Sequence, residues 1–88
     1  MRTEELIREK LTLLSPEVLE IIDDSALHAG HAGAREGGGH FRLRIVASVF
    51  LGMGTLDRHR LIYATLGDLM KTHIHALVID ASPHNSVD

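Results

Sequence analysis

The stretch HFRLRIVA, residues 40–47, decides how this chain folds. Apolar and polar residues alternate along it, which is typical of a strand that buries one face and exposes the other to solvent. The apolar side carries Phe41, Leu43 and Ile45, and the wet side carries His40, Arg42 and Arg44. We therefore expect a sheet with one covered face, and the flanking sequence should supply its other strands and its cover.

Two further strands are expected on either side of this stretch. Residues 17–23 (EVLEIID) form a short segment rich in β-branched side chains, and the turn-forming residues 23–25 (DDS) end the predicted strand. Residues 74–81 (IHALVIDA) have a similar apolar character near the end of the chain. The first two strands, joined by a long loop, predict an antiparallel hairpin.

A helix is predicted at residues 3–14 (TEELIREKLTLL). Thr3 can cap its start, and the glutamates that follow suit the positive end of the helix dipole. Pro16 ends the helix, because the residue before a proline avoids the helical region. Its apolar face follows i, i+4, i+7 spacing and carries Ile7, Leu11 and Leu14.

A second helix is predicted at residues 56–70 (LDRHRLIYATLGDLM), with Thr55 as its cap. Glycine inside a helix costs about 1 kcal/mol relative to alanine. We therefore expect close packing at Gly67 to explain its presence. The apolar face of this helix carries Ile62, Leu66, Leu69 and Met70.

The elements follow in the order α-β-β-α-β, with a glycine turn before the second helix. This order predicts an α+β fold in which a three-stranded sheet packs its helices on one face. The chain has 88 residues, so one domain is expected at residues 1–82, with a polar tail at 83–88.

Composition excludes several classes of function. The chain has no cysteine, so it forms no disulfide and supplies no thiolate. A net charge of −3 gives no overall attraction to nucleic acid or to an anionic membrane. No secretory signal and no membrane-spanning run is apparent, which favours a cytoplasmic protein. No nucleophile, base and acid can be assembled into a set, so we do not expect an enzyme.

The loop from His28 to Phe41 (HAGHAGAREGGGHF) holds three histidines and five of the eight glycines. Imidazoles at the spacing of His28 and His31, followed by His40, can ligate zinc or iron. A solvated glycine loop with idle histidines explains the same residues. Spacing alone favours the second interpretation.

His75 stands at the start of the last predicted strand. By alternation it shares a face with Leu77 and Ile79, which favours a partly buried, hydrogen-bonded histidine unless the residue lies at the rim of the sheet. A structural role is the simpler interpretation of His75 when it is considered alone.

A basic patch is the third candidate. Arginines near a helix start oppose its dipole, so a partner or a phosphate would explain Arg58 and Arg60. The turn before them resembles a phosphate-cradling turn, but no P-loop lysine follows it. A solvated face with pairs to residues such as Asp57 is the alternative. The patch would comprise Arg42, Arg44, Arg58, Arg60 and the turn glycines Gly52 and Gly54.

Taken together, these stretches resemble the BolA family over residues 2–82. The similar segments are LSPEVLEIIDDS, HAGH, GGHFRLRIVASVFLG, RHRLIYATL and IHALVIDA. The most specific features are Phe-x-Gly at 50–52, Arg-His-Arg followed by an apolar residue at 58–61, and Ile-His-Ala-Leu at 74–77. The resemblance implies an α-β-β-α-α-β fold related to the type II KH domain, with the extra helix as a short turn within residues 49–54.

The resemblance also implies a partner and a cofactor. BolA-like proteins bind monothiol glutaredoxins and share a [2Fe–2S] cluster with the glutaredoxin cysteine and glutathione. The invariant family histidine corresponds to His75, and the loop ligand corresponds best to His28, with His31 and His40 as alternates. No cofactor is expected in the isolated chain. The role would lie in iron–sulfur cluster assembly and trafficking or in iron regulation.

A second expectation follows from the same resemblance. Some BolA-like proteins are transcriptional regulators of stress response and morphology, so DNA is the alternative partner, contacted through the KH-like fold and the basic patch. No membrane contact is expected, and the isolated chain should be a monomer or a weak dimer.

Overall fold

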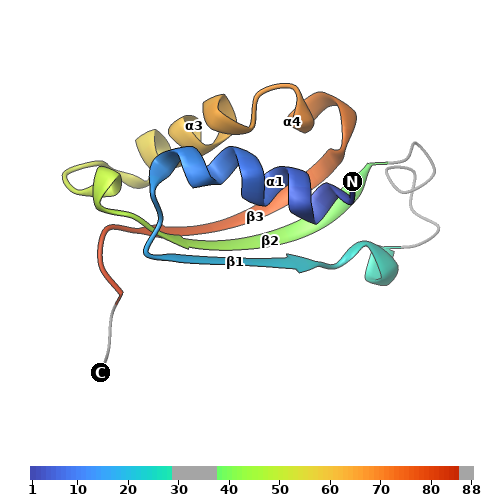
Figure 1. Ribbon diagram of the computed structural model, residues 1–88, viewed down its shortest axis with the longest axis horizontal. Helices are drawn as coiled ribbons and strands as arrows, with labels where there is room; N and C mark the ends of the chain where they lie inside the picture. The colour runs from blue at the N-terminus through green and yellow to red at the C-terminus, as the bar shows by residue number, and fades with distance from the viewer. Residues whose placement is uncertain (29–37, 86–88) are drawn as a thin grey trace.

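The computed structural model describes residues 1–28 and 38–85. Its elements alternate between helices and strands along the chain (Figure 1). In order they are α1 (Thr3–Leu11), η1 (Thr12–Leu14), β1 (Val18–Asp23), η2 (Ser25–His28), β2 (Gly39–Val46), η3 (Ser48–Phe50), α3 (Thr55–Leu66), α4 (Leu69–Thr72) and β3 (Ile74–Ser82). The three predicted strands are confirmed within a residue or two of their expected bounds.

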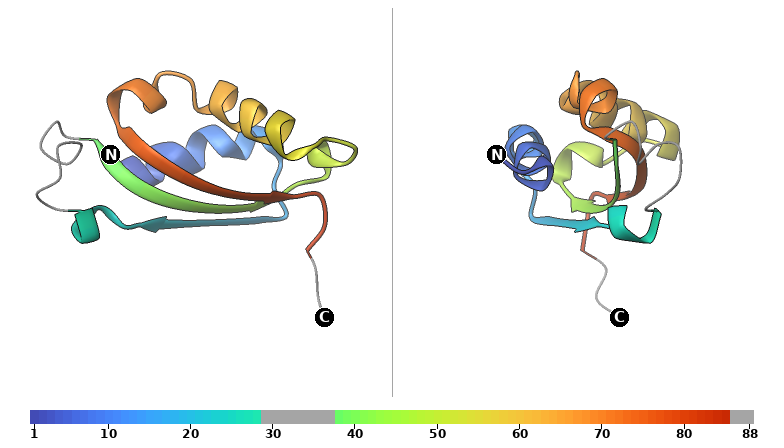
Figure 2. Two further views of the ribbon diagram at one scale, coloured as in Figure 1. Left: turned by 180° about the vertical axis from the view of Figure 1, so that it is seen from behind. Right: turned by 90° about the vertical axis from the view of Figure 1, so that its right-hand side faces the viewer.

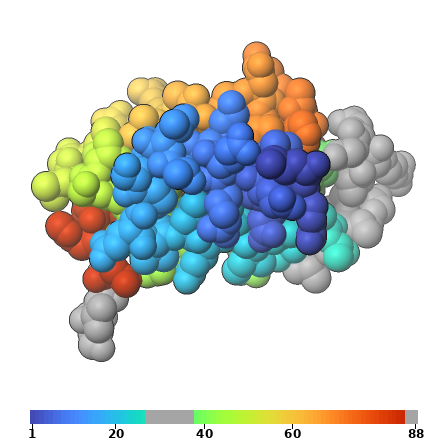
Figure 3. All heavy atoms as spheres, viewed as in Figure 1, coloured from blue at the N-terminus to red at the C-terminus, as the bar shows by residue number. Residues whose placement is uncertain are grey.

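The molecule has two layers, with the helices on one face of the sheet (Figures 1 and 2). In the space-filling view α1 covers much of the front, with α3 and α4 above it (Figure 3). No described helix lies on the opposite face of the sheet, where Ile22 and Val78 are exposed. The predicted α+β arrangement, with helices packed on one face, is confirmed.

The sheet has the strand order β1-β2-β3. β1 and β2 are antiparallel, with Ile21 opposite Leu43, so the predicted hairpin is confirmed. β2 and β3 are parallel, with Leu43 opposite Ile79. A parallel pair needs a long crossover, which here runs through η3, α3 and α4.

The core lies between the sheet and the helices and is almost wholly aliphatic. The inward side of β2 supplies three buried residues, which matches the alternation in the sequence. α1, α3 and the turn at η3 bury side chains against them. The central members are Ile7, Leu11, Phe41, Leu43, Ile45, Phe50, Ile62 and Leu66.

The second predicted helix is divided in two, which corrects the expectation of one helix at 56–70. α3 stops at Leu66, and α4 begins at Leu69. Gly67 between them has φ +56° and ψ −127°, a conformation that glycine alone adopts readily. A Cβ at Gly67 would lie 3.9 Å from its nearest neighbour, the carbonyl oxygen of Ala64. The prediction that close packing explains this glycine is therefore wrong.

The predicted threonine caps are also wrong. Thr3 and Thr55 are the first helical residues, and the N-cap positions fall on Arg2 and Gly54 without a side-chain hydrogen bond. The first helix ends as α at Leu11 and continues to Leu14 as the 3₁₀ turn η1. The stop before Pro16 is confirmed.

The short helical turn implied by the family resemblance is present as η3, slightly earlier than residues 49–54. It inserts Phe50 fully into the core. Within the described residues, none of the helices is both long and apolar enough to span a bilayer.

Candidate functional site

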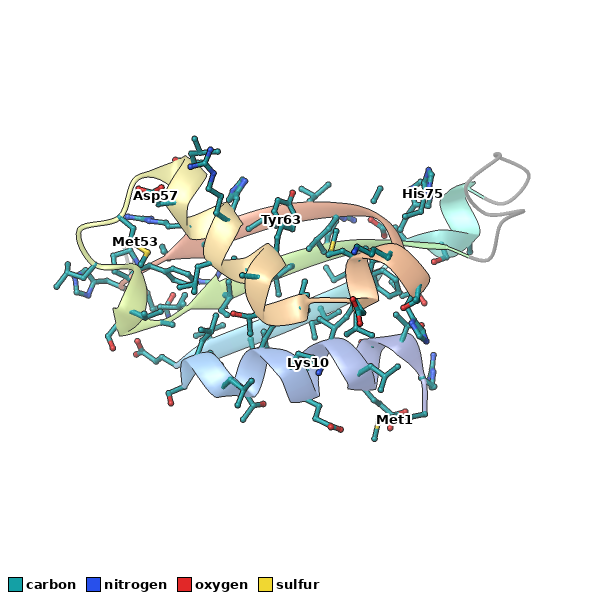
Figure 4. All side chains as sticks on the ribbon, turned by 90° about the horizontal axis from the view of Figure 1, so that it is seen from above. Met1, Lys10, Met53, Asp57, Tyr63 and His75 are labelled. Carbon is teal, nitrogen blue, oxygen red and sulfur yellow. The ribbon has the colours of Figure 1, made fainter. Side chains whose placement is uncertain are left out.

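The rings of His40 and His75 lie side by side at one end of the sheet. Their centroids are 5.2 Å apart, and the ring planes are inclined by 47°. Figure 4 shows His75 projecting near η2, at the opposite end of the molecule from Met53 and Asp57. The fold therefore brings together two of the four histidines that the sequence nominated.

A β-bulge aims His75 outward. The register pairs Gly39 with Ile74 but His40 with Ala76, so β3 has one extra residue at this point. Ile74 is only 4% exposed, and Leu77 packs against the core, so two residues separate the inward positions instead of one. The predicted partly buried His75 is therefore wrong: its side chain is exposed.

The chain before His40 approaches His75 closely. A Cβ at Gly38 would lie 2.7 Å from the Cβ of His75 and 3.2 Å from its backbone nitrogen. The Gly39 N–H donates to the carbonyl of His73 at 3.0 Å. The missing side chain at Gly38 thus leaves room for the bulged start of β3.

The backbone of His40 is held at both ends by the segment that follows β1. Its N–H donates to Ser25 Oγ at 3.1 Å, and its carbonyl accepts from the Asp24 N–H at 2.8 Å. The Ser25 N–H donates to Asp23 Oδ1 at 2.9 Å. Hydrogen bonds from the Ser25 side chain and backbone lower the pKa of Asp23. This network fixes η2 beside His40.

For the other two loop histidines, His28 and His31, the structure describes no side-chain position. The backbone of His28 closes η2, but its side chain lies outside the described part of the chain. His31 lies outside the described residues altogether. The second ligand therefore stays a prediction, and His40 is the alternate whose ring is placed beside His75.

The arginines of the expected basic patch do not form one surface. Arg42 Nε lies 2.5 Å from Asp24 Oδ2, on the open face of the sheet. Arg44 donates to Asn85 Oδ1 at 2.7 Å and lies 3.5 Å from a carboxylate oxygen of Glu20. Both charges are therefore matched by neighbours within the chain.

The two arginines of the RHR motif have different surroundings. Arg58 is half-buried and donates to the carbonyls of Met53 and Ala81 at 2.8 and 2.9 Å. Arg60 is exposed and makes no hydrogen bond to the described residues. Gly52 has φ +82°, and a Cβ at Gly52 or Gly54 would meet nothing within 4 Å.

Sequence reasoning missed Ser25, Asp23 and Gly38 as parts of the site. The DDS sequence had been interpreted only as the end of a strand, although Asp and Ser in a turn commonly hydrogen-bond nearby backbone. The paired glycines at 38 and 39, just before a strand, are a signal for close approach of another backbone.

The site offers imidazoles but no complete metal shell. Within the described ranges, no group of three or more His, Asp or Glu side chains could hold an ion. Two imidazoles that share one iron, with thiolates supplied from elsewhere, would fit this donor set. An ion held by these two imidazoles would need further ligands beyond those that the described residues offer.

Comparison with known proteins places this geometry in a family. The profile of the BolA-like protein family matches residues 11–85. Relatives include SufE-like protein 1, chloroplastic/mitochondrial, of Arabidopsis thaliana (49% identity over 85% of this chain and 22% of that protein) and BolA-like protein 1 of Mus musculus (46%, over 89% and 56%). The DNA-binding transcriptional regulator BolA of Escherichia coli K12 is 39% identical, over 90% and 73%.

Solved structures agree in fold. BolA1 from Arabidopsis thaliana superposes with a TM-score of 0.79 and 40% identity, covering 99% of this chain and 97% of that one. The BolA domain of SufE1 from the same plant gives 0.75 and 49%, covering 88% and 87%. The chain spans about a fifth and about half of the first two relatives above. In sequence and in fold, this chain belongs to the BolA-like protein family.

Proposed function

We propose that this protein is a binding partner of a monothiol glutaredoxin, rather than an enzyme, and that the two share a [2Fe–2S] cluster. The observation that carries the proposal is the exposed side chain of His75, which a β-bulge turns outward and which lies beside the ring of His40. The chain has no cysteine that could serve as a ligand instead. The cellular role would be iron–sulfur cluster assembly and trafficking, or iron regulation, in the cytoplasm.

The donor chemistry supports this role. A chain without thiolates cannot hold an all-cysteine cluster alone, so the glutaredoxin cysteine and glutathione would supply the thiolates. Histidine ligation raises the reduction potential of a cluster relative to thiolate ligation. Because neutral imidazole is the ligand, occupancy should weaken as the pH falls through the titration range of histidine.

His75 is the first ligand in this proposal. His28 is our choice for the second, with His31 and His40 as alternates. The position of the His40 ring beside His75 favours His40 among the residues whose side chains are described. The family correspondence of HAGH favours His28.

The experiment is reconstitution of the cluster on a mixture of this chain, a monothiol glutaredoxin and glutathione. Visible absorption and circular dichroism then report the ligands. His75→Ala should change the spectrum and shorten the lifetime of the cluster, whereas His73→Ala, two positions earlier, should not. If His75→Ala matches the parent in both readouts, the ligand assignment is wrong. Single alanine variants of His28, His31 and His40 identify the second ligand.

DNA binding is the second candidate, because the Escherichia coli relative is named a DNA-binding transcriptional regulator. The exposed Arg60 beside the glycine turn would contact phosphate. This region lies at the end of the molecule opposite His75 (Figure 4), so the two functions can be tested separately. Each phosphate contact should add about 0.9 to the log–log salt slope on duplex DNA. A flat salt dependence, or unchanged binding by Arg60→Ala, removes this candidate.

A further inference from the structure

We infer that two copies of this chain associate edge to edge through β3 and form one continuous sheet about a two-fold axis at Val78. The partner is a second copy of the same chain, and the contact lies in the middle of the strand. The inference goes beyond the proposed function and does not depend on it, because the contact involves no metal, cluster or glutaredoxin.

The outer edge of β3 presents backbone groups that the sheet does not use. β3 is an edge strand, since the strand order is β1-β2-β3 (Figure 2). The carbonyl of Ser82 accepts from the backbone just after β2, and that of Ala81 points the other way, to Arg58. Backbone groups alternate in direction along a strand, so Ile79 and Leu77 also direct their N–H and C=O groups away from β2. No strand of the described residues lies against this side of β3.

The other edge of the sheet, β1, is less open to pairing. Arg8 donates to the carbonyl of Leu19 at 3.2 Å, within the six residues of β1, and Glu20 and Asp23 add two carboxylates to that strand. Charged side chains on an edge strand discourage pairing with another chain. β3 has nine residues, and Asp80 is the one carboxylate among them. β3 is therefore the edge that can accept a strand.

The sequence of β3 is self-complementary in an antiparallel pairing about Val78. Leu77 of one copy then lies opposite Ile79 of the other, and both direct their backbone groups outward, so each such pair exchanges two N–H···O bonds. Val78 meets Val78 of the second copy on the axis, in the type of pair that brings side chains closer together. Asp80 lies opposite Ala76, so no two like charges face each other directly.

The side chains that this pairing covers are apolar on both faces of the sheet. On the open face, Val78 is 62% exposed in the single chain and is covered by its own copy in the dimer. On the helix face, Leu77 and Ile79 are half-buried against the core, and the pairing continues that core across the axis. Arg58 ends the ladder on each side, since it occupies the Ala81 carbonyl. A contact this short is typical of a weak dimer.

The test is sedimentation equilibrium of the full chain from about 10 µM to about 1 mM, the range in which weak complexes assemble. The weight-average mass should rise from 9.7 kDa toward twice that value. Val78→Lys should remain monomeric, because it sets two ammonium groups opposite each other. Ile22→Lys is the matched control and should associate like the parent, since Ile22 is 51% exposed on the same face of the other edge strand. If Ile22→Lys is as monomeric as Val78→Lys, the contact does not lie at β3.

A mixture of opposite charges tests the register. Val78→Glu alone should also be monomeric. An equimolar mixture of Val78→Lys and Val78→Glu should form a mixed dimer, because opposite charges then face each other on the axis. If the mixture stays monomeric while the parent associates, the pairing about Val78 is wrong.

A second measurement uses the parent chain and does not depend on how the variants fold. On dilution, the amide NMR signals of Leu77 and Ile79 should shift, because their N–H groups lose hydrogen bonds to the second copy. The amide of Ile21, which faces the same way as the Leu19 carbonyl at the β1 edge, should not shift. The inference is overturned if the parent is monomeric throughout the range, if Val78→Lys associates like the parent, or if Ile21 shifts as much as Leu77.

Discussion

Arg58 donates a hydrogen bond from Nη1 to the carbonyl of Ala81 at 2.9 Å, joining the first turn of α3 to the far end of β3. Its Nε donates to the carbonyl of Met53 at 2.8 Å. One guanidinium thus holds the glycine turn, the helix and the last strand together. This relationship makes Arg58 a structural residue, although its motif suggested a surface for a partner.

Arg58→Ala should therefore lower the free energy of unfolding. A hydrogen bond to a charged group contributes about 1.5–3 kcal/mol, and the half-buried carbonyls would also lose a partner. Arg60→Ala should stay within about 0.5 kcal/mol of the parent, as is usual for an exposed side chain. Urea unfolding of both variants checks the difference. Equal stabilities would mean that the two contacts of Arg58 contribute nothing.

Gly38→Ala should destabilise the start of β3. The new Cβ would lie 2.7 Å from the Cβ of His75, so one backbone must shift, and such overpacking typically costs about 1–3 kcal/mol. Gly54→Ala is the matched control, because its Cβ would meet nothing within 4 Å and its φ is −75°. Thermal unfolding measures the stability, and the amide shift of His75 reports the displacement. An unmoved His75 amide would contradict the close approach.

Gly67→Ala should cost about 1–3 kcal/mol, since the positive φ between α3 and α4 strains any other residue. If Gly67 were simply a weak helical residue, alanine would instead stabilise the chain by about 1 kcal/mol. The sign of the change in denaturant midpoint decides between these two descriptions.

Ser25→Ala should reduce stability at neutral pH more than in acid. The pKa of Asp23 is held below its ordinary value of 3.8, first by the Ser25 side chain and then by the Ser25 backbone. A carboxyl group with a lowered folded pKa stabilises the fold above its unfolded pKa, and this contribution is lost as the pH falls through the folded value. The difference in unfolding free energy between parent and variant should therefore shrink below about pH 4. A constant difference across that range would exclude the carboxylate as the cause.

The sequence predicts most where a pattern is long and regular. The alternation of residues 40–47 identified the central strand, its buried side and its wet side, because one pleated strand imposes all three. The same rule failed at His75, because a bulge is set by the pairing with β2 and leaves no mark in the local pattern. The hydrogen bonds of Ser25 to His40 and of Arg58 to Ala81 likewise join segments far apart in the chain.

The role of a glycine is hard to predict from the sequence. Gly67 permits a backbone with positive φ, whereas Gly38 permits the close approach of His75. Composition alone cannot separate these two uses. The histidine loop is a similar case, since three imidazoles in one glycine-rich stretch leave the choice of ligand open until the fold positions them.

The parallel pairing of β2 with β3 determines when the histidine pair can exist during folding. β1 and β2 can form their hairpin early, whereas β3 joins only after the chain between them has folded back over the sheet. If β3 opens locally, His75 leaves His40 while the hairpin remains intact. Anything that binds both rings should therefore slow amide hydrogen exchange selectively in β3. The rate of amide hydrogen exchange in β3 would then report whether a ligand occupies the two rings.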